Sequence, residues 1–296
     1  MAIAITTPTG NVGRKVTERL LANGADLILL VRDAEKLSDA VRQQAKVFSG
    51  SIDDPAFVIE ATRGAEALFW VSPINFNVPN VHTWYENLAR SAATAVKTNN
   101  IARVVNLSSV GAHLETGLGV ISSLRTVEQQ LDAVATNIIH LRPDYFMENY
   151  FHQLEPLQTQ ASVFLPLAGK QRFRQIATGD IAQVAADLLF DSSWQGHSII
   201  GLQGSANISF DEAAAILSKV LRKTITHKQI SYEQFNDVML SQGASLDVAA
   251  QYTQMWKGLS SPDFKPAQPS SIALQIHIKT YNREIRVSNN TYACPL

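Results

Sequence analysis

A glycine-containing turn near the start of the chain is the first feature that could do chemistry. The run Thr6-Thr7-Pro8-Thr9-Gly10-Asn11-Val12-Gly13 follows a short apolar segment and precedes residues with helical spacing. Gly10 allows backbone N–H groups to approach a diphosphate closely, and Gly13 allows the following helix to pack tightly against the strand. The N-terminus of a helix favours an anion, because its first N–H groups are unpaired and it carries partial positive charge. The turn therefore indicates a dinucleotide phosphate site, and a plain structural turn is the alternative.

Two polar residues, Arg32 and Asp33, end the second apolar segment. They lie 19 and 20 residues beyond Gly13. An acidic residue at this distance binds the ribose 2′-hydroxyl of NAD, whereas an arginine meets the 2′-phosphate of NADP. Arg32 comes first and its planar guanidinium suits a phosphate. We therefore expect NADP as the cofactor, with NAD as the alternative. If the two residues have no binding role, they are simply a solvated Arg-Asp pair at the end of a strand.

The first half of the chain alternates short apolar runs with segments of helical spacing. Strands that are apolar on both faces and separated by helices predict a parallel sheet covered on both sides. Right-handed crossovers then favour a three-layer, doubly wound α/β fold of the Rossmann type. The expected strands are Ala2–Thr6, Asp26–Val31, Lys46–Phe48, Ala67–Val71, Arg103–Leu107 and Asn137–Leu141.

The second half lacks this rhythm and predicts a smaller C-terminal α+β lobe beside the sheet. We expect residues 1–152 to form the dinucleotide-binding domain, with 170–205 returning to it, and 153–169 and 206–260 to form the substrate lobe. Residues 261–296 are a tail of uncertain structure, in which Ile276–Ile278 and Arg283–Val287 are candidate edge strands. Other expected elements are a helix over Thr178–Phe190, a strand over Ser198–Leu202, and helices opened by the capping boxes Ser209/Glu212 and Ser231/Gln234.

Composition excludes several classes of protein. Hydrophobic residues make up 46% and charged residues 17%, and the net charge is −1. Nucleic acid and anionic membranes both need a concentrated basic face, so neither is an expected partner. The single cysteine, Cys294, fits a reducing compartment, and no apolar run approaches the roughly 20 residues that span a bilayer. We expect a soluble cytoplasmic protein.

Three stretches resemble the NmrA-like family of atypical short-chain dehydrogenase/reductases. They are Thr7–Gly13, Leu107-Ser108-Ser109-Val110-Gly111-Ala112 and, as the most specific, Leu141-Arg142-Pro143-Asp144-Tyr145-Phe146-Met147-Glu148-Asn149. The resemblance covers roughly residues 1–260 and implies a cofactor path along the carboxyl ends of the strands. On that path, Thr7, Thr9, Gly10, Asn11, Val12 and Gly13 hold the pyrophosphate and Arg32 the adenosine phosphate. Ser51 and Ile52 lie near the adenine, Ser72 and Pro73 near the ribose, Ser108 near the nicotinamide, Pro143 and Tyr145 at the far end, and Phe146 and Asn149 on the substrate cleft.

Two departures from the family limit what the resemblance implies. The family usually has glycine at the position of Thr7. The wider superfamily uses a tyrosine four residues before a lysine, and counting back from Glu128 places that pair at Val120 and Leu124. Neither side chain can move a proton, so the ordinary alcohol–ketone mechanism has no residues here.

The remaining chemical candidates are weak. The seven histidines show no metal-ligand spacing with cysteine or carboxylate, so no metal site is expected. His113 and Tyr145 are the only candidate catalytic residues, and a loop histidine and an aromatic wall are their plainer interpretations. Met255 and Trp256 lie at helical spacing and indicate packing within the lobe.

Three hypotheses remain at this point. The first is an NAD(P)H-dependent reductase of flat conjugated acceptors such as quinones, azo compounds or dyes, for which water could supply the proton. The second is a non-catalytic NAD(P) redox sensor that changes its association with a regulatory protein or a second copy of itself. A relative of sugar-nucleotide epimerases ranks last, because that chemistry depends on the same missing tyrosine.

Overall fold

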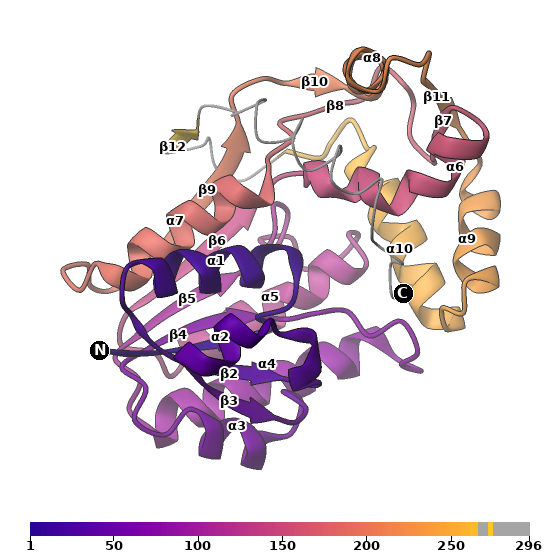
Figure 1. Ribbon diagram of the computed structural model, residues 1–296. Coiled ribbons are helices and arrows are strands. Elements are labelled where there is room, and N and C mark those ends of the chain that lie inside the picture. Colours follow the sequence, from indigo (N-terminus) through magenta and orange to yellow (C-terminus); the bar gives the residue numbers. More distant parts are fainter. Residues whose placement is uncertain (266–271, 275–296) are drawn as a thin grey trace.

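A parallel β-sheet forms the centre of the molecule. The computed structural model describes residues 1–265 and 272–274. Within this part of the chain the sheet has eight strands in the order β12-β9-β6-β5-β4-β1-β2-β3, and each neighbouring pair is parallel (Figure 1). The strands are β1 Ala2–Thr6, β2 Asp26–Val31, β3 Ala45–Ser49, β4 Ala67–Val71, β5 Arg103–Leu107, β6 Ile138–Pro143, β9 His197–Gly204 and β12 Ile272–Leu274. The tail strands expected at Ile276–Ile278 and Arg283–Val287 lie outside the described residues.

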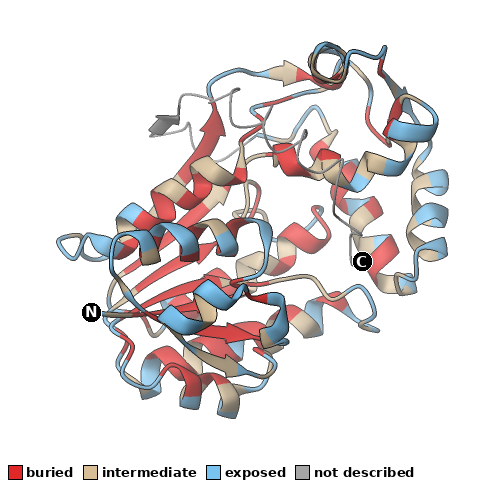
Figure 2. Cartoon of the chain, viewed as in Figure 1, coloured by how far each residue is buried: buried red, intermediate tan, exposed pale blue. Residues whose placement is uncertain are grey.

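Helices cover both faces of the sheet. On one face lie α1 Asn11–Ala22, α2 Asp39–Gln44 and α7 Thr178–Phe190, and on the other lie α3 Pro55–Ala61, α4 Val81–Thr98 and α5 Val120–Asp132. Successive residues of a strand point to opposite faces: Ile3 and Ile5 of β1 pack with α1 and α7, whereas Ala4 packs with α4. The central strands β1, β2, β4 and β5 are accordingly buried on both faces (Figure 2). No helix in the described part of the chain is long and apolar enough to cross a membrane.

The expected three-layer, doubly wound sheet is confirmed. Strands β1, β2, β4 and β5 begin and end at the predicted residues, and β6 runs two residues further, to Pro143. The strand order reverses beside β1, which lies between β2 and β4. In open α/β sheets, ligands bind outside the carboxyl ends of the strands at such a switch point.

A smaller α+β lobe lies at the upper right of the molecule in Figure 1. Parallel β7/β11 and antiparallel β8/β10 form its two small sheets. Both predicted capping boxes are present, at Ser209/Glu212 and Ser231/Gln234. The elements of the lobe are the 3₁₀ helix η2 Met147–Gln153, α6 Leu154–Thr159, β7 Ser162–Leu165, β8 Arg172–Phe173, β10 Ile208–Ser209, α8 Phe210–Leu221, β11 Thr226–Gln229, α9 Tyr232–Ser241 and α10 Leu246–Leu259. A further 3₁₀ helix, η1 Ala34–Lys36, follows β2 in the chain and precedes α2.

Helix α10 of the lobe packs so closely against the sheet domain that backbone atoms of the two parts are in contact. A Cβ on Gly119, the residue before α5, would lie 1.9 Å from the Gln251 carbonyl oxygen, so only glycine fits there. At the start of α10, the Ser245 N–H donates to the Phe76 carbonyl at 2.8 Å, and the Asp247 carboxylate accepts the N–H of Val81 at 2.6 Å. The helix is therefore anchored to the loop after β4 and to the start of α5.

Candidate functional site

The residues assigned to the cofactor path all follow strands at one edge of the sheet. Because β3, β2, β1, β4, β5 and β6 are parallel neighbours, their carboxyl ends lie side by side. In that order along the edge lie Ser51-Ile52, Arg32, Thr7–Gly13, Ser72-Pro73, Ser108 and Pro143–Tyr145. The order of these residues along the edge is the order in which the family resemblance arranges them along the cofactor.

The glycine turn leaves the first turn of α1 open. Gly10 is the N-cap residue of α1 and no side chain caps the helix there, whereas Asp54 and Asn80 cap α3 and α4 with their side chains. A Cβ on Gly13 would lie 2.1 Å from the Thr7 carbonyl oxygen, so α1 can begin this close to β1 only without a side chain. The unpaired N–H groups beside Gly10 form an anion site that fits a diphosphate.

Thr7 adopts the conformation for which the family's usual glycine is suited. Its φ is 51°, in the left-handed region, which costs a residue with a Cβ about 1–2 kcal/mol. The turn holds it there, since the Gly10 N–H donates to the Thr7 carbonyl at 3.0 Å. The departure from glycine is therefore accommodated by strain and leaves the turn intact.

Arg32 and Asp33 do different work at the end of β2. The Asp33 carboxylate accepts the N–H of Glu35 at 3.0 Å and caps η1. Arg32 is exposed, and its guanidinium has no hydrogen bond or ion pair with the described residues. The acidic side chain is thus occupied locally, whereas the basic one is available to a phosphate.

Two tryptophans fix the loop after β4. The indole N–H of Trp70 donates to the Ser72 hydroxyl at 2.9 Å, and that of Trp84 donates to the Pro73 carbonyl at 2.8 Å. After β3, where the resemblance places the adenine, Ser51 is exposed and its hydroxyl donates to Asp53, while Ile52 is buried. The middle of the edge is therefore rigid before any ligand arrives.

A buried ion pair lies behind Ser108. The guanidinium of Arg142, on β6, donates from Nε to Glu128 Oε1 at 2.9 Å and from Nη2 to Oε2 at 2.5 Å. Burial raises the pKa of Glu128, but the hydrogen bonds from Arg142 and the charge of His140 outweigh it and hold that pKa below its usual value. Glu128 is consequently an anion that orients Arg142, and it is no proton donor.

His113 lies in the loop that follows Ser108. Its carbonyl accepts Arg125 Nη1 at 2.7 Å. Burial, together with the charges of Arg142 and Arg125, lowers the pKa of His113, although Glu128 opposes this. The imidazole is therefore neutral at neutral pH, which leaves it able to donate or accept one hydrogen bond at each ring nitrogen.

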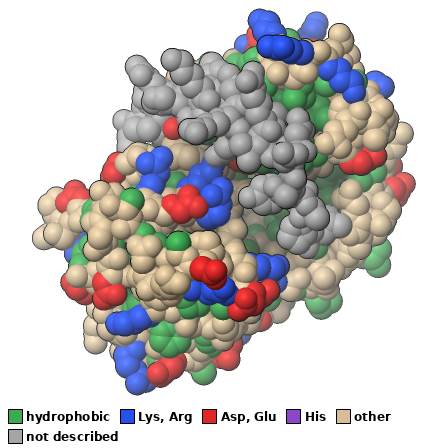
Figure 3. All heavy atoms as spheres, viewed as in Figure 1, with side chains coloured by type: hydrophobic (Ala, Val, Ile, Leu, Met, Phe, Trp, Pro, Cys, Tyr) green, Lys and Arg blue, Asp and Glu red, His purple; other side chains and the backbone are tan. Residues whose placement is uncertain are grey.

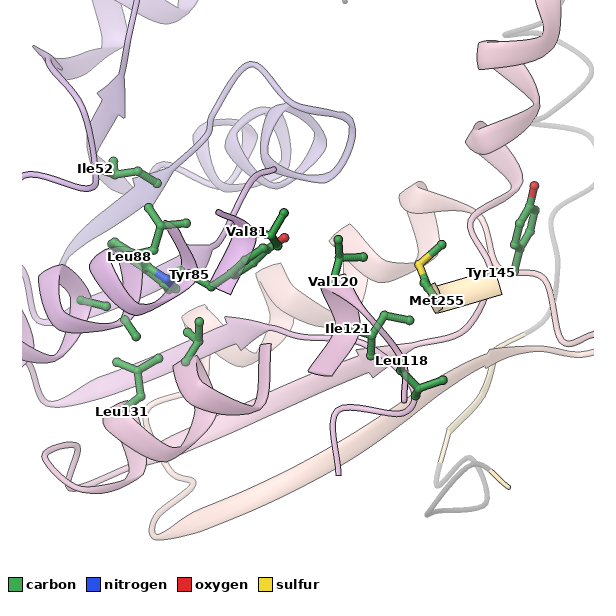
Figure 4. Close-up of a cluster of buried hydrophobic side chains, with 14 of the residues drawn as sticks. Ile52, Val81, Tyr85, Leu88, Leu118, Val120, Ile121, Leu131, Tyr145 and Met255 are labelled. Atoms are coloured by element: carbon green, nitrogen blue, oxygen red, sulfur yellow. The ribbon is translucent and has the colours of Figure 1, made fainter. Parts of the chain in front are cut away.

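The positions of the superfamily's catalytic pair are apolar. Val120 is 7% exposed, and Leu124 packs against the same hydrophobic cluster. Figure 4 shows Val120 and Ile121 between Val81 of α4 and Met255 of α10. Val120 and Leu124 themselves therefore carry no group that could transfer a proton.

Tyr145 faces the lobe and Phe146 faces the other way. Tyr145 belongs to the cluster that includes Trp256 of α10, whereas Phe146 packs on the α1 and α7 side of the sheet. Asn149 is partly exposed within η2. The structure therefore brings Tyr145 to the lobe and separates it from Phe146, which leaves the cleft roles of Phe146 and Asn149 as predictions.

Glu148 makes contacts that the sequence alone did not indicate. Its buried carboxylate accepts Lys15 Nζ at 3.1 Å and the N–H and hydroxyl of Thr178 at the start of α7. The residue stands inside the motif Leu141–Asn149, but its partners are 133 and 30 positions away. It ties the segment after β6 to the helix that begins at the glycine turn.

Asp144 is a second carboxylate in the same motif. Its Oδ1 accepts the N–H of Tyr145 at 2.7 Å, and Oδ2 accepts the N–H of Arg174 at 3.3 Å. Burial raises the pKa of Asp144 to about 6, against these two donors and the Arg174 charge, which lower it. The carboxylate links the end of β6 to the start of the lobe.

Charged side chains are mixed by sign over the lower part of the face shown in Figure 3, whereas basic side chains gather at its top. No three His, Cys, Asp or Glu side chains of the described residues gather in an arrangement that could hold a metal ion. The chemistry of this edge therefore rests on the backbone turn, Arg32 and the polar ends of β4, β5 and β6.

A doubly wound sheet whose switch point carries an open, glycine-lined helix N-terminus defines a dinucleotide-binding protein. A protein-family model described as NAD(P)H-binding matches residues 8–192, more than half of the chain. The chain belongs to this NAD(P)H-binding family, and the resemblance to the NmrA-like, atypical short-chain dehydrogenase/reductase group is confirmed.

Three known proteins illustrate the similarity. An NAD(P)H azoreductase from Xenophilus azovorans is 23% identical over 262 residues, which are 88% of each chain. The triphenylmethane reductase of Citrobacter sp., solved with NADP(H), has a TM-score of 0.73 and 21% identity over 96% of this chain and 99% of its own. An NADPH-dependent quinone oxidoreductase from Escherichia coli, solved with NADPH, has a TM-score of 0.72 and 21% identity with the same coverage. At this identity, the two structures show that the fold is shared.

The glycine turn predicts the result of one substitution. In Gly13→Ala the new Cβ meets the Thr7 carbonyl, so the turn must open and we expect NADPH affinity to fall by at least about tenfold, the equivalent of about 1.4 kcal/mol. Fluorescence titration with NADPH measures this. Gly179→Ala is the matched control, because a Cβ there meets nothing within 4 Å. Unchanged affinity in a folded Gly13→Ala protein would contradict the assignment.

Asp144 predicts a pH dependence of stability. Because its folded pKa lies above the unfolded value, the folded state binds its proton more tightly, and the stability from this group falls as pH rises from about 4 to about 6. A shift of about two units corresponds to about 3 kcal/mol. Asp144→Asn should remove that slope from urea unfolding curves, measured as the difference from wild type across this range. Asp191→Asn is the control and should leave the slope in this range unchanged, because hydrogen bonds from Ser193 lower the pKa of Asp191 and its contribution varies only below about pH 4. A slope unaltered in Asp144→Asn would refute the burial argument.

Proposed function

We propose that this protein is an NAD(P)H-dependent reductase of flat conjugated acceptors, such as quinones, azo compounds and related dyes. One observation carries the proposal: the dinucleotide edge ends at an aromatic wall around Tyr145, while the catalytic positions Val120 and Leu124 are apolar. The names of the azoreductase, triphenylmethane reductase and quinone oxidoreductase relatives support the same class of substrate.

Conjugated acceptors suit a site that lacks a proton donor. Reduction of a simple ketone creates an alkoxide, which needs an acid such as tyrosine in the same step. A quinone that accepts a hydride instead becomes a delocalised phenolate, which water can protonate afterwards. The absence of the tyrosine and lysine is therefore compatible with this reaction and unfavourable for alcohol–ketone chemistry.

The residues of the chain would hold and orient the reactants. When bound, the reduced dinucleotide supplies the hydride. The turn at Gly10 and Gly13 would bind its diphosphate, and Ser72 and Ser108 would lie along the rest of the edge. The ring of Tyr145 would exclude water from one side, so that the chain acts mainly through proximity and orientation. The imidazole of His113 is our candidate for a hydrogen-bond donor to the reduced acceptor, because its neutral form keeps one ring N–H.

NADP(H) is the cofactor that the free guanidinium of Arg32 favours. Asp33 caps η1 with the carboxylate that NAD would need for its ribose hydroxyls. The Citrobacter and Escherichia coli relatives were solved with NADP(H) and NADPH. We therefore propose a preference for NADP(H), with binding of NAD(H) as the weaker alternative.

Turnover is tested by mixing the purified protein with NADPH and a panel containing 1,4-naphthoquinone, an azo dye and crystal violet. We expect the absorbance of the reduced cofactor to fall faster than in a protein-free control with at least one of the acceptors. Gly13→Ala serves as the matched inactive variant. Rates equal to the protein-free control for every acceptor would remove the proposal.

The cofactor preference is tested with Arg32→Ala. A charge-assisted hydrogen bond contributes about 1.5–3 kcal/mol, so the dissociation constant of NADPH should rise about tenfold to a hundredfold. That of NADH should stay within about twofold of wild type, because NADH lacks the phosphate. Arg63→Gln, a change at an exposed arginine after α3 that pairs with Glu60, is the control. If the affinities for NADPH and NADH fall equally, Arg32 does not bind the 2′-phosphate.

The apolar positions Val120 and Leu124 also favour a second candidate function. A protein that binds NAD(P) without turnover could act as a redox sensor, which associates with a regulatory protein or a second copy of itself according to the redox state. Such a sensor must bind NADP⁺ and NADPH with different affinities, because a ligand shifts states only by its differential binding. If the acceptor panel gives no turnover, calorimetric titrations with NADP⁺ and NADPH test the sensor. Different affinities for the two forms would support it, and equal affinities would count against it.

A further inference from the structure

Aromatic side chains from four elements meet around Tyr145. The centroid of its ring lies 5.5 Å from that of Phe210 in α8, 5.9 Å from that of Phe173 in β8 and 6.2 Å from that of Trp256 in α10. Tyr150 of η2 lies 5.9 Å away, edge to face. These separations are those of interacting aromatic pairs. We call these five residues the Tyr145 cluster; it begins where β6 ends, two residues after Pro143.

Two polar atoms in the Tyr145 cluster are buried without a hydrogen-bond partner among the described residues: the Tyr150 hydroxyl and the Trp256 indole N–H. A hydroxyl can both donate and accept, whereas the indole N–H can only donate, so Trp256 is the atom that needs an acceptor. The Trp256 side chain is 8% exposed, yet its indole N–H is buried and has no hydrogen-bond acceptor among the described residues. Unpaired buried donors are rare in native proteins, because each loses its hydrogen bonds to water without replacement. A donor of this kind in a rigid apolar wall is suited to an acceptor atom that arrives with a ligand.

The other tryptophans show what the chain does with an indole N–H elsewhere. The sequence contains four tryptophans. Trp70, Trp84 and Trp194 donate to Ser72 Oγ, the Pro73 carbonyl and the Leu188 carbonyl, at 2.9, 2.8 and 2.8 Å. Of the four, Trp256 is the one whose N–H has no partner among the described residues, and its ring is the one recorded against that of Tyr145. Its role therefore extends beyond the packing that its helical spacing indicated.

Helix α10 holds Trp256 in a fixed position relative to the dinucleotide edge. Gly119 contacts the backbone of α10 at Gln251, and Met255 lies beside Val120 (Figure 4). The residue next to Trp256 thus packs where the superfamily places its catalytic tyrosine. The donor and the reactive end of the edge belong to one rigid arrangement.

We propose that the indole N–H of Trp256 binds the acceptor atom of the substrate: a quinone carbonyl oxygen or an azo nitrogen of a flat aromatic molecule lying against the Tyr145 cluster. This proposal rests on the proposed function and narrows its substrate class. A site that leaves a buried donor unpaired discriminates against molecules without an acceptor. The protein therefore selects quinones and azo compounds over triarylmethane cations, whose amine nitrogens are conjugated with the positive charge.

The test compares Trp256→Phe, which removes the N–H and keeps an aromatic ring, with Trp194→Phe, which removes a surface-side N–H. For 1,4-naphthoquinone we expect Trp256→Phe to raise KM about threefold to tenfold and to leave kcat within about twofold. KM for crystal violet should stay within about twofold, and Trp194→Phe should change neither substrate. If crystal violet is not reduced, its dissociation constant from equilibrium dialysis replaces KM. An equal KM for naphthoquinone in wild type and Trp256→Phe would overturn the proposal and leave Trp256 a packing residue.

A second measurement separates this proposal from the reductase function and does not depend on the variant's folding. In ¹⁵N spectra of the wild-type protein with NADP⁺, adding 1,4-naphthoquinone should shift the indole resonance of Trp256 downfield more than those of the other three tryptophans. If the Trp256 resonance shifts but no acceptor is turned over, the proposal that Trp256 donates to the ligand stands and the reductase proposal fails. Turnover of naphthoquinone with an unmoved Trp256 resonance would retain the reductase and reject the donor.

Discussion

The close approach of α1 to β1 is the constraint on which the site depends. The Thr7 carbonyl oxygen would lie 2.1 Å from any Cβ at position 13, so the turn exists only because residue 13 is glycine. Gly10 then leaves the helix without a side-chain cap, and the first N–H groups of α1 are open at the switch point of the sheet. Even the strained φ of Thr7 is tolerated, because the turn's own hydrogen bond holds that residue in place.

Buried carboxylates connect this turn to the rest of the site. Glu148 pairs with Lys15 of α1 and caps α7, Glu128 pairs with Arg142, and Asp144 accepts N–H groups from both sides of the junction with the lobe. Removing one partner of such a pair typically costs about 3–5 kcal/mol, because a buried charge is left uncompensated. The charged residues of the motif Leu141–Asn149 thus have a structural role, because they connect β6 to three helices and orient Tyr145 toward the lobe.

The loss of the catalytic pair and the presence of an aromatic wall belong together. With Val120 and Leu124 apolar, the site is poorly suited to substrates that need protonation in the same step as reduction. An aromatic surface beside the dinucleotide edge suits substrates whose own conjugation stabilises the added electrons. Under the proposed function, the chain replaces acid catalysis with the positioning of a narrower set of acceptors.

Much of the fold could be predicted because its causes are local. Apolar runs such as Ala2–Thr6 and Ala67–Val71 are buried on both faces, and capping boxes such as Ser209/Glu212 need only three neighbouring residues. The positions of Gly10, Gly13 and Arg32 were readable for the same reason. Pairs such as Lys15–Glu148 could not be predicted, because 133 residues separate them and only folding sets their distance.

By itself, the sequence determined the doubly wound sheet, the glycine turn and the candidate phosphate contact, since periodicity and short-range spacing control each of them. Only the tertiary structure decided that Tyr145 and Phe146 face opposite sides of the sheet. It also decided that Asp33 is occupied as a cap and that Trp256 lies against Tyr145 with its N–H unpaired. Which side chains meet, and which donors stay unsatisfied, depends on packing between distant segments, and no local pattern in the chain encodes that.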